Sequence, residues 1–354
     1  MSIAVIGIVG LPASYGGFET LAEHLVETSE EQFTVYCSSK HYVERLDSYK
    51  SAKLVYVPLS ANGPVSIIYD IYCMLHAVMT GHKKLLILGT SGAIAIPLIR
   101  LAFPRVTVAT NIDGIEWRRD KWQGFAKRFL RFSEKLAVRF SSVVIADNES
   151  IAEYVRKTFD RECSVIAYGG DHAIVSKVDN SASSALEVQS KFALSLCRIE
   201  PENNVHIILE AFSRSRQKLV FIGNWQSSEY GRALSKQYDS YANIRLLEPI
   251  YDLQKLYCYR RSCRVYIHGH SAGGTNPSLV EFMHFSKPII AFDCPYNRAT
   301  MENGGLYFNS VSTLLAQLAN IGSLDNCGKM REIAQRRYTW KIVRQQYYSV
   351  FYKG

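Results

Sequence analysis

Short apolar and β-branched runs alternate with stretches of helical spacing along almost the whole chain. In the first half these runs predict strands at Ile3–Ile6, Phe33–Cys37, Lys53–Val57, Leu85–Leu88, Val106–Thr110 and Ser142–Ile145. Between most of them lie segments whose apolar residues recur at helical spacing, such as Gly17–Thr28 and Val65–Thr80. This alternation is typical of a parallel β-sheet with crossover helices.

The same pattern begins again in the second half. A polar stretch at residues 179–184 precedes further predicted strands at Phe192–Cys197, Lys218–Ile222, Ile244–Leu247, Val265–Ile267 and Pro288–Phe292. A last apolar pattern, from Trp340 to Phe351, predicts a helix. Two successive units of this kind predict an α/β protein with two facing Rossmann-like domains. We expect domains at residues 1–170 and 171–335, followed by a helical segment at 336–354.

Composition agrees with a globular protein that has two cores. The chain has 354 residues, of which 47% are hydrophobic and 21% charged, and one core rarely serves so long a chain. The longest uncharged run is Leu85–Ile99, which is shorter than the roughly 20 apolar residues of a membrane span. No basic segment precedes an apolar stretch at the N-terminus. The eight cysteines form no C-x-x-C pair, which indicates reduced thiols. We therefore expect a soluble, cytoplasmic protein.

A glycine-rich turn follows the first predicted strand. It runs from Gly10 to Glu19, contains Gly16 and Gly17, and opens a helix. Such a turn exposes backbone N–H groups that suit a diphosphate, although a tight turn without a ligand is an open alternative. The segment Gly7–Gly10 does not meet the dinucleotide pattern G-x-G-x-x-G, which disfavours a nicotinamide site.

A second turn of this kind precedes a predicted helix near residue 277. Asn276 suits the N-cap and Pro277 the first helical position, while Gly273 and Gly274 permit close approach of a ligand. Glu281 lies one turn inside the helix, where a carboxylate could hold ribose hydroxyls. A capped helix with a structural glutamate explains these residues equally well.

Two further polar motifs also follow predicted strands. Arg198 comes after the first strand of the second half, where its guanidinium suits phosphate oxygens; an ion pair with Glu200 or Glu202 is the simpler explanation. Asp113 and Glu116 follow the strand Val106–Thr110 and suit sugar hydroxyls, although a helix cap by Asp113 is the alternative. All four motifs lie at the carboxyl ends of strands, where α/β sheets bind ligands.

With these motifs the chain resembles the retaining glycosyltransferases of family four, in their bacterial rhamnosyltransferase-like branch. The resemblance covers nearly the full chain. It rests on Leu11–Thr20 (Leu-Pro-Ala-Ser-Tyr-Gly-Gly-Phe-Glu-Thr), Asn111–Trp117 (Asn-Ile-Asp-Gly-Ile-Glu-Trp), Cys197–Asn204 (Cys-Arg-Ile-Glu-Pro-Glu-Asn-Asn) and, most specifically, His268–Glu281 (His-Gly-His-Ser-Ala-Gly-Gly-Thr-Asn-Pro-Ser-Leu-Val-Glu).

The resemblance implies a GT-B fold with an acceptor-side first domain, a donor-binding second domain and a last helix that crosses back to the first. It implies that Arg198 binds the donor diphosphate and Glu281 the ribose. Asp113 and Glu116 become the candidate catalytic residues, near the acceptor or the transferred sugar. The full candidate donor-binding set is Gly16, Gly17, Arg198, Asn203, Gly274, Thr275, Asn276, Ser278 and Glu281.

Two positions depart from the family pattern. The wider family places a glutamate eight positions before the one that matches Glu281, where this chain has Gly273. Its usual lysine after the arginine is replaced by Asn203. A carboxylate near the donor sugar and a positive charge near the diphosphate are therefore missing.

The implied reaction is sugar transfer with retention, in which the protein stabilises the leaving diphosphate. The sequence contains no Asp-x-Asp motif, so we expect neither a metal nor another cofactor. Arg198 and helix N-termini would carry the positive charge instead.

The net charge of +9 is concentrated in one segment. Residues 118–139 contain eight basic and two acidic residues, so they carry a net +6. Aromatic residues recur there at helical spacing, which is typical of a membrane-surface helix; a core helix with a solvated basic face is an equal alternative. Without a nucleic-acid-binding motif, nucleic acid is not an expected partner. The candidate membrane or acceptor patch is Arg118, Arg119, Lys121, Trp122, Lys127, Arg128 and Arg131.

The sequence thus predicts a peripheral enzyme at the inner face of the plasma membrane. It would move a sugar, with dTDP-L-rhamnose as the favoured donor, onto a polyprenyl-diphosphate-linked glycan of a bacterial surface polysaccharide. Two alternatives remain: a sugar-nucleotide epimerase on the same fold, and a non-catalytic protein that binds nucleotide sugar or glycan.

Overall fold

The computed structural model describes residues 2–14, 16–28, 30–118, 122–175, 191–321 and 325–352. It divides into two compact units, Met1–Ala167 with Trp340–Gly354, and Tyr168–Thr339. The chain therefore crosses between the units at 167/168 and at 339/340, where the sequence led us to expect boundaries at 170/171 and 335/336. The polar stretch at residues 179–184 lies outside the described residues.

The described part of the first unit contains an eight-stranded sheet with the order β3-β4-β2-β1-β5-β6-β7-β8. Only β3 is antiparallel to its neighbour; the other pairs are parallel. Most of these strands are buried because helices cover both faces. Their bounds are β1 Ile3–Ile6, β2 Phe33–Ser38, β3 Ser48–Tyr49, β4 Ala52–Val57, β5 Lys84–Leu88, β6 Thr107–Asn111, β7 Val143–Ala146 and β8 Ser164–Val165.

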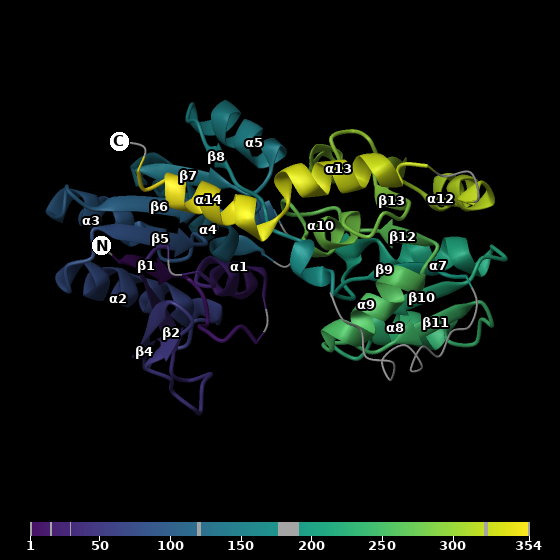
Figure 1. The fold of residues 1–354 in the computed structure, drawn as a ribbon, viewed down its shortest axis with the longest axis horizontal. Coiled ribbons are helices and arrows are strands. Elements are labelled where there is room, and N and C mark those ends of the chain that lie inside the picture. The colour runs from purple at the N-terminus through teal and green to yellow at the C-terminus, as the bar shows by residue number, and fades with distance from the viewer. Residues whose placement is uncertain are drawn as a thin grey trace. The chain divides into compact units, whose positions relative to one another are not determined.

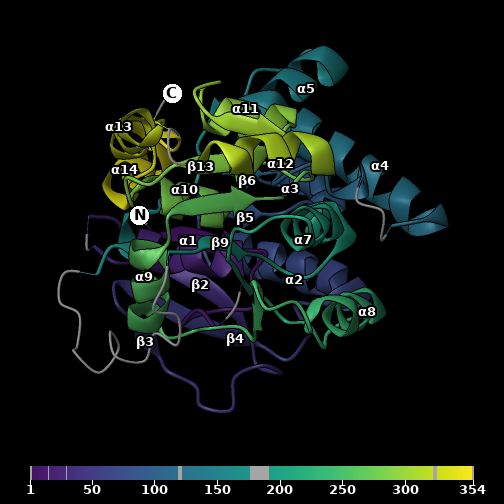
Figure 2. The same ribbon diagram turned by 90° about the vertical axis from the view of Figure 1, so that its right-hand side faces the viewer.

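Helices of the first unit lie on opposite faces of this sheet (Figures 1 and 2). Strands β2 to β4 lie on one side of β1 in the sheet, and strands β5 to β8 lie on its other side. Because crossover connections are right-handed, α1 lies on one face of the sheet and α2, α3 and α4 lie on the opposite face. The bounds are α1 Gly17–Leu25, α2 Ser66–Met79, α3 Ile96–Ala102, α4 Gly124–Phe140, α5 Glu149–Phe159 and α14 Trp340–Ser349. Short 3₁₀ turns occupy Gly63–Val65, Ala93–Ala95 and Glu116–Arg118.

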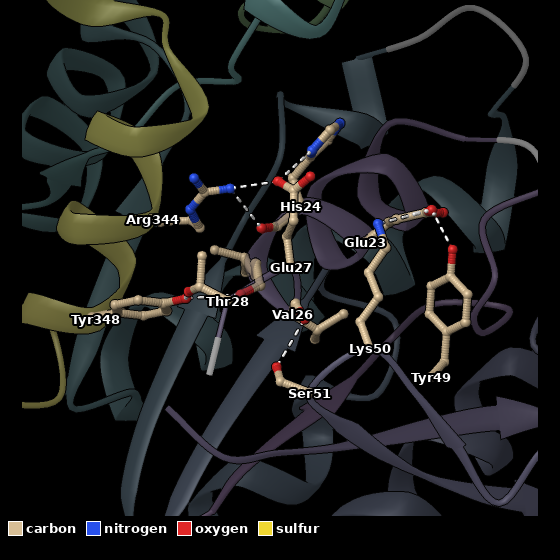
Figure 3. A network of polar contacts seen from close by, with 11 residues as sticks. Glu23, His24, Val26, Glu27, Thr28, Tyr49, Lys50, Ser51, Arg344 and Tyr348 are labelled. Carbon is tan, nitrogen blue, oxygen red and sulfur yellow. Dashed lines mark hydrogen bonds and ion pairs between the residues drawn. The ribbon is translucent and has the colours of Figure 1, made fainter. Parts of the chain in front are cut away.

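The C-terminal helix α14 belongs to the first unit and packs on α1. Trp340 stacks on His24 with ring centroids 4.1 Å apart. Arg344 forms an ion pair with Glu27 at 2.6 Å, and Tyr348 donates a hydrogen bond to the carbonyl of Leu25 at 2.8 Å (Figure 3). Helix α14 is therefore an integral part of the first unit, where it packs against residues from the beginning of the chain.

The second unit contains a six-stranded parallel sheet with the order β11-β10-β9-β12-β13-β14. Its strands are β9 Ala193–Leu196, β10 Leu219–Ile222, β11 Ile244–Leu247, β12 Val265–His268, β13 Ile289–Phe292 and β14 Leu306–Phe308. A core of buried apolar residues on β9, β10 and β12 packs against α7 and α12. This is a doubly wound arrangement of the Rossmann kind.

The helices of the second unit alternate with its strands. Their bounds are α7 Val205–Ser213, α8 Glu229–Tyr238, α9 Leu253–Ser262, α10 Pro277–Met283, α11 Pro295–Thr300, α12 Val311–Ala319 and α13 Cys327–Arg337, with 3₁₀ turns at Asp171–Ala173 (η4) and Pro201–Asn203 (η5). Both units therefore confirm the expected α/β class with parallel sheets.

Candidate functional site

In each sheet the order in which the chain adds its strands reverses at one strand. The ligand-binding crevice of an α/β sheet lies at this topological switch point. In the first unit β1 lies between β2 and β5, and in the second β9 lies between β10 and β12. The glycine turn follows β1, Arg198 follows β9, and the loop Gly269–Asn276 follows β12. Three of the four predicted motifs thus begin at a switch point of their own sheet, and the fourth, with Asp113, follows β6.

The N-terminus of α1 is covered by a carboxylate of the helix itself. Gly16 is the N-cap with φ 122°, and a side chain there would collide with the Glu19 carboxylate. Glu19 Oε1 accepts a hydrogen bond from the Val9 N–H at 3.0 Å. Burial raises the pKa of Glu19, and hydrogen bonds from the backbone of Val9 and Glu19 oppose that shift. A phosphate bound at Gly16 and Gly17 would therefore face the Glu19 carboxylate. Glu19 was not among the predicted site residues, although an acidic residue in the first turn of a helix can be recognised in the sequence.

Asp113 lies on a tight turn at the end of β6. Its φ of 59° is left-handed, and its N–H donates to Asn111 Oδ1 at 2.8 Å. The Asn111 amide in turn donates to the hydroxyl of Tyr347 at 2.6 Å. Glu116 accepts a hydrogen bond from the Trp122 indole at 2.8 Å. Both candidate catalytic carboxylates thus follow β6 within one short loop, and the buried Asn111 positions that loop.

Basic residues of the candidate patch gather around one indole ring. The cations of Arg118, Lys127 and Arg131 lie 5.4, 6.0 and 5.3 Å from the Trp117 ring centroid, where cation–π attraction operates. Arg128 is exposed and Trp122 half-buried, while Arg119 and Lys121 lie outside the described residues.

A buried glutamate of α4 holds this indole in place. Glu134 Oε1 accepts hydrogen bonds from Trp117 at 3.3 Å and Tyr154 at 2.7 Å. Burial raises the pKa of Glu134, while the two hydrogen bonds and the charge of Arg118 act in the opposite direction. The aromatic ring at the centre of the patch is therefore fixed by the core.

In the second unit Arg198 is exposed at the end of β9. Its guanidinium lies 3.7 Å from Glu200 Oε1, and both side chains are well exposed, so this ion pair contributes little to stability. The ion pair of Arg198 with Glu200, the simpler explanation of this motif, is therefore present. It is weak enough that a diphosphate could replace it.

The loops after β9 and β12 are tied together by side-chain hydrogen bonds. Buried Asn203 donates from Nδ2 to the Arg198 carbonyl and accepts at Oδ1 from His270, both at 2.7 Å. Asn204 donates to the Gly269 carbonyl at 2.8 Å, and Ser271 donates from its N–H and hydroxyl to the carbonyl of Glu202. Asn203, predicted as a donor-binding residue, therefore also joins the loop of Arg198 to the glycine loop.

The expected cap of α10 is confirmed. Asn276 is the N-cap, Pro277 occupies the first turn, and Asn276 Oδ1 accepts from the N–H and hydroxyl of Ser278 at 3.0 and 2.7 Å. The N–H of Ser278, a predicted donor-binding residue, is therefore bonded to the cap. Gly274 and Thr275, both buried, lie directly before it.

Glu281 is held by two basic side chains from distant parts of the second unit. Arg260 of α9, which is buried, forms an ion pair with Oε2, and His172 Nε2 of η4 lies 3.3 Å from Oε1. Burial raises the pKa of Glu281, but Arg260 and His172 outweigh it, so the pKa lies below its usual range. The carboxylate is thus ionised and oriented. Neither partner is indicated by spacing in the sequence, because only the fold brings them together.

The described residues of the two units contain no group of three or more His, Cys, Asp or Glu side chains that could hold a metal ion. No helix among them has both the length and the apolar character needed to cross a bilayer.

Two family models match the chain. Residues 1–171 match a model described as a domain of unknown function, DUF1972, and residues 176–324 match the model described as glycosyl transferases group 1. The second half thus carries a group 1 glycosyltransferase domain, and Arg198 and Glu281 both lie in it. A search of curated protein sequences found no match.

Solved structures resemble this chain over its full length. Sucrose-phosphate synthase from Thermosynechococcus elongatus is 14% identical with a TM-score of 0.82, over 99% of this chain and 98% of that one. Anabaena HepE in complex with UDP is 17% identical with a TM-score of 0.73 over both whole chains. Trehalose-6-phosphate synthase OtsA is 8% identical with a TM-score of 0.77, over 100% and 99%. These likenesses confirm the GT-B fold.

Proposed function

We propose that this protein is a retaining hexosyltransferase that moves a sugar from a nucleotide diphosphate onto a polyprenyl-linked glycan in bacterial surface polysaccharide (O-antigen or capsule) synthesis. The observation that carries this proposal is the group 1 glycosyltransferase domain with Arg198 at the switch point of its sheet. The solved HepE complexes contain UDP and UDP-glucose, which supports a nucleotide-sugar donor for the same fold.

In this proposal the charges of the second unit bind the donor. The exposed Arg198 guanidinium neutralises the diphosphate, whose negative charge grows as the sugar leaves. The Glu281 carboxylate, kept ionised by Arg260 and His172, accepts hydrogen bonds from the ribose. Asp113 and Glu116 are assigned to the acceptor or the transferred sugar. We propose dTDP-L-rhamnose as the donor, on the resemblance of His268–Glu281 to the rhamnosyltransferase branch.

The experiment that tests the donor site is a thermal-shift screen of the full-length protein with dTDP, UDP and GDP and their sugars. A nucleotide at 100 times its dissociation constant adds about 2.7 kcal/mol to the free energy of unfolding. We expect one nucleotide to stabilise the wild type and Arg198→Ala to lose that shift. Arg232→Ala, an exposed arginine of α8, is the matched control. A wild type that no nucleotide stabilises would refute the proposal.

We further propose that transfer needs no divalent metal, because a cationic side chain replaces the metal at the diphosphate. Activity should persist in EDTA. Loss of activity in EDTA that manganese restores would contradict this.

We propose that the outer surface of α2, α3 and α4 lies on the inner membrane, where the acceptor is anchored. Five basic residues of α4 are exposed: Lys127, Arg128, Arg131, Lys135 and Arg139. Large apolar side chains are also exposed on these three helices, with Phe125 of α4 at 83%, Leu101 of α3 at 81%, and Ile68 and Met79 of α2 at 60% and 78%. A surface that combines such side chains with positive charge suits an anionic lipid bilayer. We call it the α2–α4 face.

One observation favours a second candidate, a non-catalytic protein that binds nucleotide sugar. Gly273 has φ 98°, a conformation that disfavours the glutamate of the wider family at this position. Turnover of the bound donor with a lipid-linked acceptor separates the two functions: binding without turnover would support the non-catalytic candidate.

A further inference from the structure

Three cations of the first unit converge on one aromatic ring. The guanidinium groups of Arg118 and Arg131 and the ammonium group of Lys127 all lie within 6.0 Å of the Trp117 ring centroid. Lys127 and Arg131 are one turn apart on α4, so they are neighbours on its surface. The Arg118 guanidinium also lies 5.0 Å from the ring centroid of Tyr154. All three basic residues are exposed, so a ligand can reach them. We call these three cations and the Trp117 ring the indole cluster.

The positive charge of the indole cluster is not balanced by contact with acidic groups. Within the part of the chain that the structure describes, Arg118, Lys127 and Arg131 have no ion-pair partner. The buried Glu134 carboxylate feels the charges of Arg118 and Arg131, but its Oε1 accepts a hydrogen bond from the Trp117 indole, and burial raises its pKa. Like charges around one ring repel each other, and cation–π attraction offsets only part of that repulsion. The cluster therefore favours an anion.

Helix α4 places two of these cations next to side chains that suit a lipid. At about 3.6 residues per turn, Phe125 and Phe132 lie on the side of α4 opposite the buried Glu134. They are 83% and 55% exposed. Lys127 and Arg131 lie between these two sides of the helix. On the proposed membrane face, the two cations would thus lie just inside the apolar side chains, at the depth of a membrane-anchored phosphate.

We propose that the indole cluster binds the diphosphate of the polyprenyl-linked acceptor. This rests on the proposed function, which supplies such an acceptor. Guanidinium groups donate paired hydrogen bonds to phosphate oxygens, and the hydrogen bond from Trp117 to Glu134 holds the ring in place before the ligand arrives. A diphosphate also carries more negative charge than the single phosphate diester of a lipid headgroup. Arg118 belongs to the same 3₁₀ turn as the candidate catalytic residue Glu116, so a sugar attached to this diphosphate begins beside Glu116.

The test uses geranyl diphosphate, a short and soluble polyprenyl diphosphate, in calorimetric titrations of the full-length protein. Arg118→Gln combined with Arg131→Gln should weaken its binding by about tenfold or more, because both arginines make charge-assisted hydrogen bonds. The matched control, Lys135→Gln with Arg139→Gln, removes two exposed cations further along α4. It should change the affinity by no more than about twofold in 0.15 M salt, which screens charges that make no direct contact. Geraniol, which lacks the diphosphate, should not bind.

Three results would overturn the inference by showing that the indole cluster is not a diphosphate site. They are no binding of geranyl diphosphate to the wild type, equal losses in the arginine variant and the control, and no loss in either. Dihexanoyl-phosphatidylglycerol, a soluble phospholipid, tests the other source of phosphate and should bind more weakly. If it binds as tightly as geranyl diphosphate and through the same arginines, the cluster is a lipid-headgroup site and the inference is wrong.

The donor site is measured separately in the same proteins. Arg198→Ala should keep its affinity for geranyl diphosphate, and the variant of Arg118 and Arg131 should keep its affinity for the nucleotide that stabilises the wild type. Loss of geranyl diphosphate binding in Arg198→Ala would place this ligand at the donor site and overturn the inference. Nucleotide binding without geranyl diphosphate binding would overturn the inference and leave the proposed function standing. Geranyl diphosphate binding through the cluster without any nucleotide binding would support the diphosphate site and refute the proposed function.

Discussion

Asp70 is a buried carboxyl of α2 whose ionised form the fold disfavours. It accepts a hydrogen bond from the Ser91 hydroxyl in the loop after β5. Burial raises its pKa to about 7, although the hydrogen bonds from Ser91 and the Gly92 N–H act the other way. The native protein therefore keeps a proton here that the unfolded chain, with a pKa of about 3.9, has already lost.

Asp70→Asn should consequently gain stability relative to the wild type as pH rises. Between about pH 4 and 7 the native state binds more protons than the unfolded state, so wild-type stability falls through this window. The variant has no carboxyl group here, so its stability does not fall in this way. The loss of stability in the wild type amounts to at most about 4 kcal/mol and is constant above pH 7. Urea unfolding from pH 5 to 8 measures the difference, with exposed Asp239→Asn as control. A difference between variant and wild type that does not change with pH would contradict the prediction.

Local rules predicted some residues of the candidate site and missed others. The cap at Asn276 and Pro277 is confirmed because it depends on neighbouring residues alone. His172 and Arg260 could not be predicted as partners of Glu281, since they come from η4 and α9 and meet it only in the folded unit. The contact of His270 with Asn203 could not be predicted for the same reason.

At the scale of elements, α4 and α2 show what apolar patterning can and cannot reveal. Basic charge singled out α4 in the sequence, but its buried positions are Ser133, Glu134, Ala137 and Val138, while Phe125 and Phe132 are exposed. In α2 both faces are apolar, so periodicity predicted a helix without indicating which face is exposed. The structure shows the exposed one to be Ile68, Tyr72, Leu75 and Met79.

The α2–α4 face should bind vesicles that contain anionic lipid in preference to zwitterionic ones. Replacing Lys127, Arg128 and Lys135 by Gln should weaken that binding by about 100-fold at low salt, at about 1 kcal/mol per charge. Replacing Ile68, Leu75 and Met79 by Gln should weaken binding to both kinds of vesicle, because apolar burial does not depend on lipid charge. Co-sedimentation measures both effects.

The control for charge alone replaces Arg216, Lys218 and Lys236 by Gln. These exposed basic residues belong to the second unit and are not part of the α2–α4 face. It should bind vesicles as the wild type does. Equal losses in the control and in the α4 variant would mean that net charge, and not this face, governs the binding.

At the scale of the whole molecule, alternation of strands and helices predicted the class of fold and most of its strands. Strands β3, β8 and β14 were missed because each has only two or three residues, too few for a period to be recognised. The placement of α14 came from the family resemblance and not from its pattern, since an amphipathic helix does not indicate which surface covers it.

Removing residues 340–354 should therefore unfold the first unit and leave the second folded. Trp340, Val343, Tyr347 and Tyr348 are buried in the first unit, and burial of each large side chain contributes roughly 1.5–3 kcal/mol. Their sum approaches the whole stability of a typical domain. Hydrogen exchange of the shortened protein should show protection lost in β1, β2 and α1 but kept in β9, β10 and β12. Tyr347→Phe, which removes only the hydrogen bond with Asn111, should keep protection in both units. If β1 and β2 stay protected without α14, the first unit is stable without the end of the chain and α14 is an accessory helix.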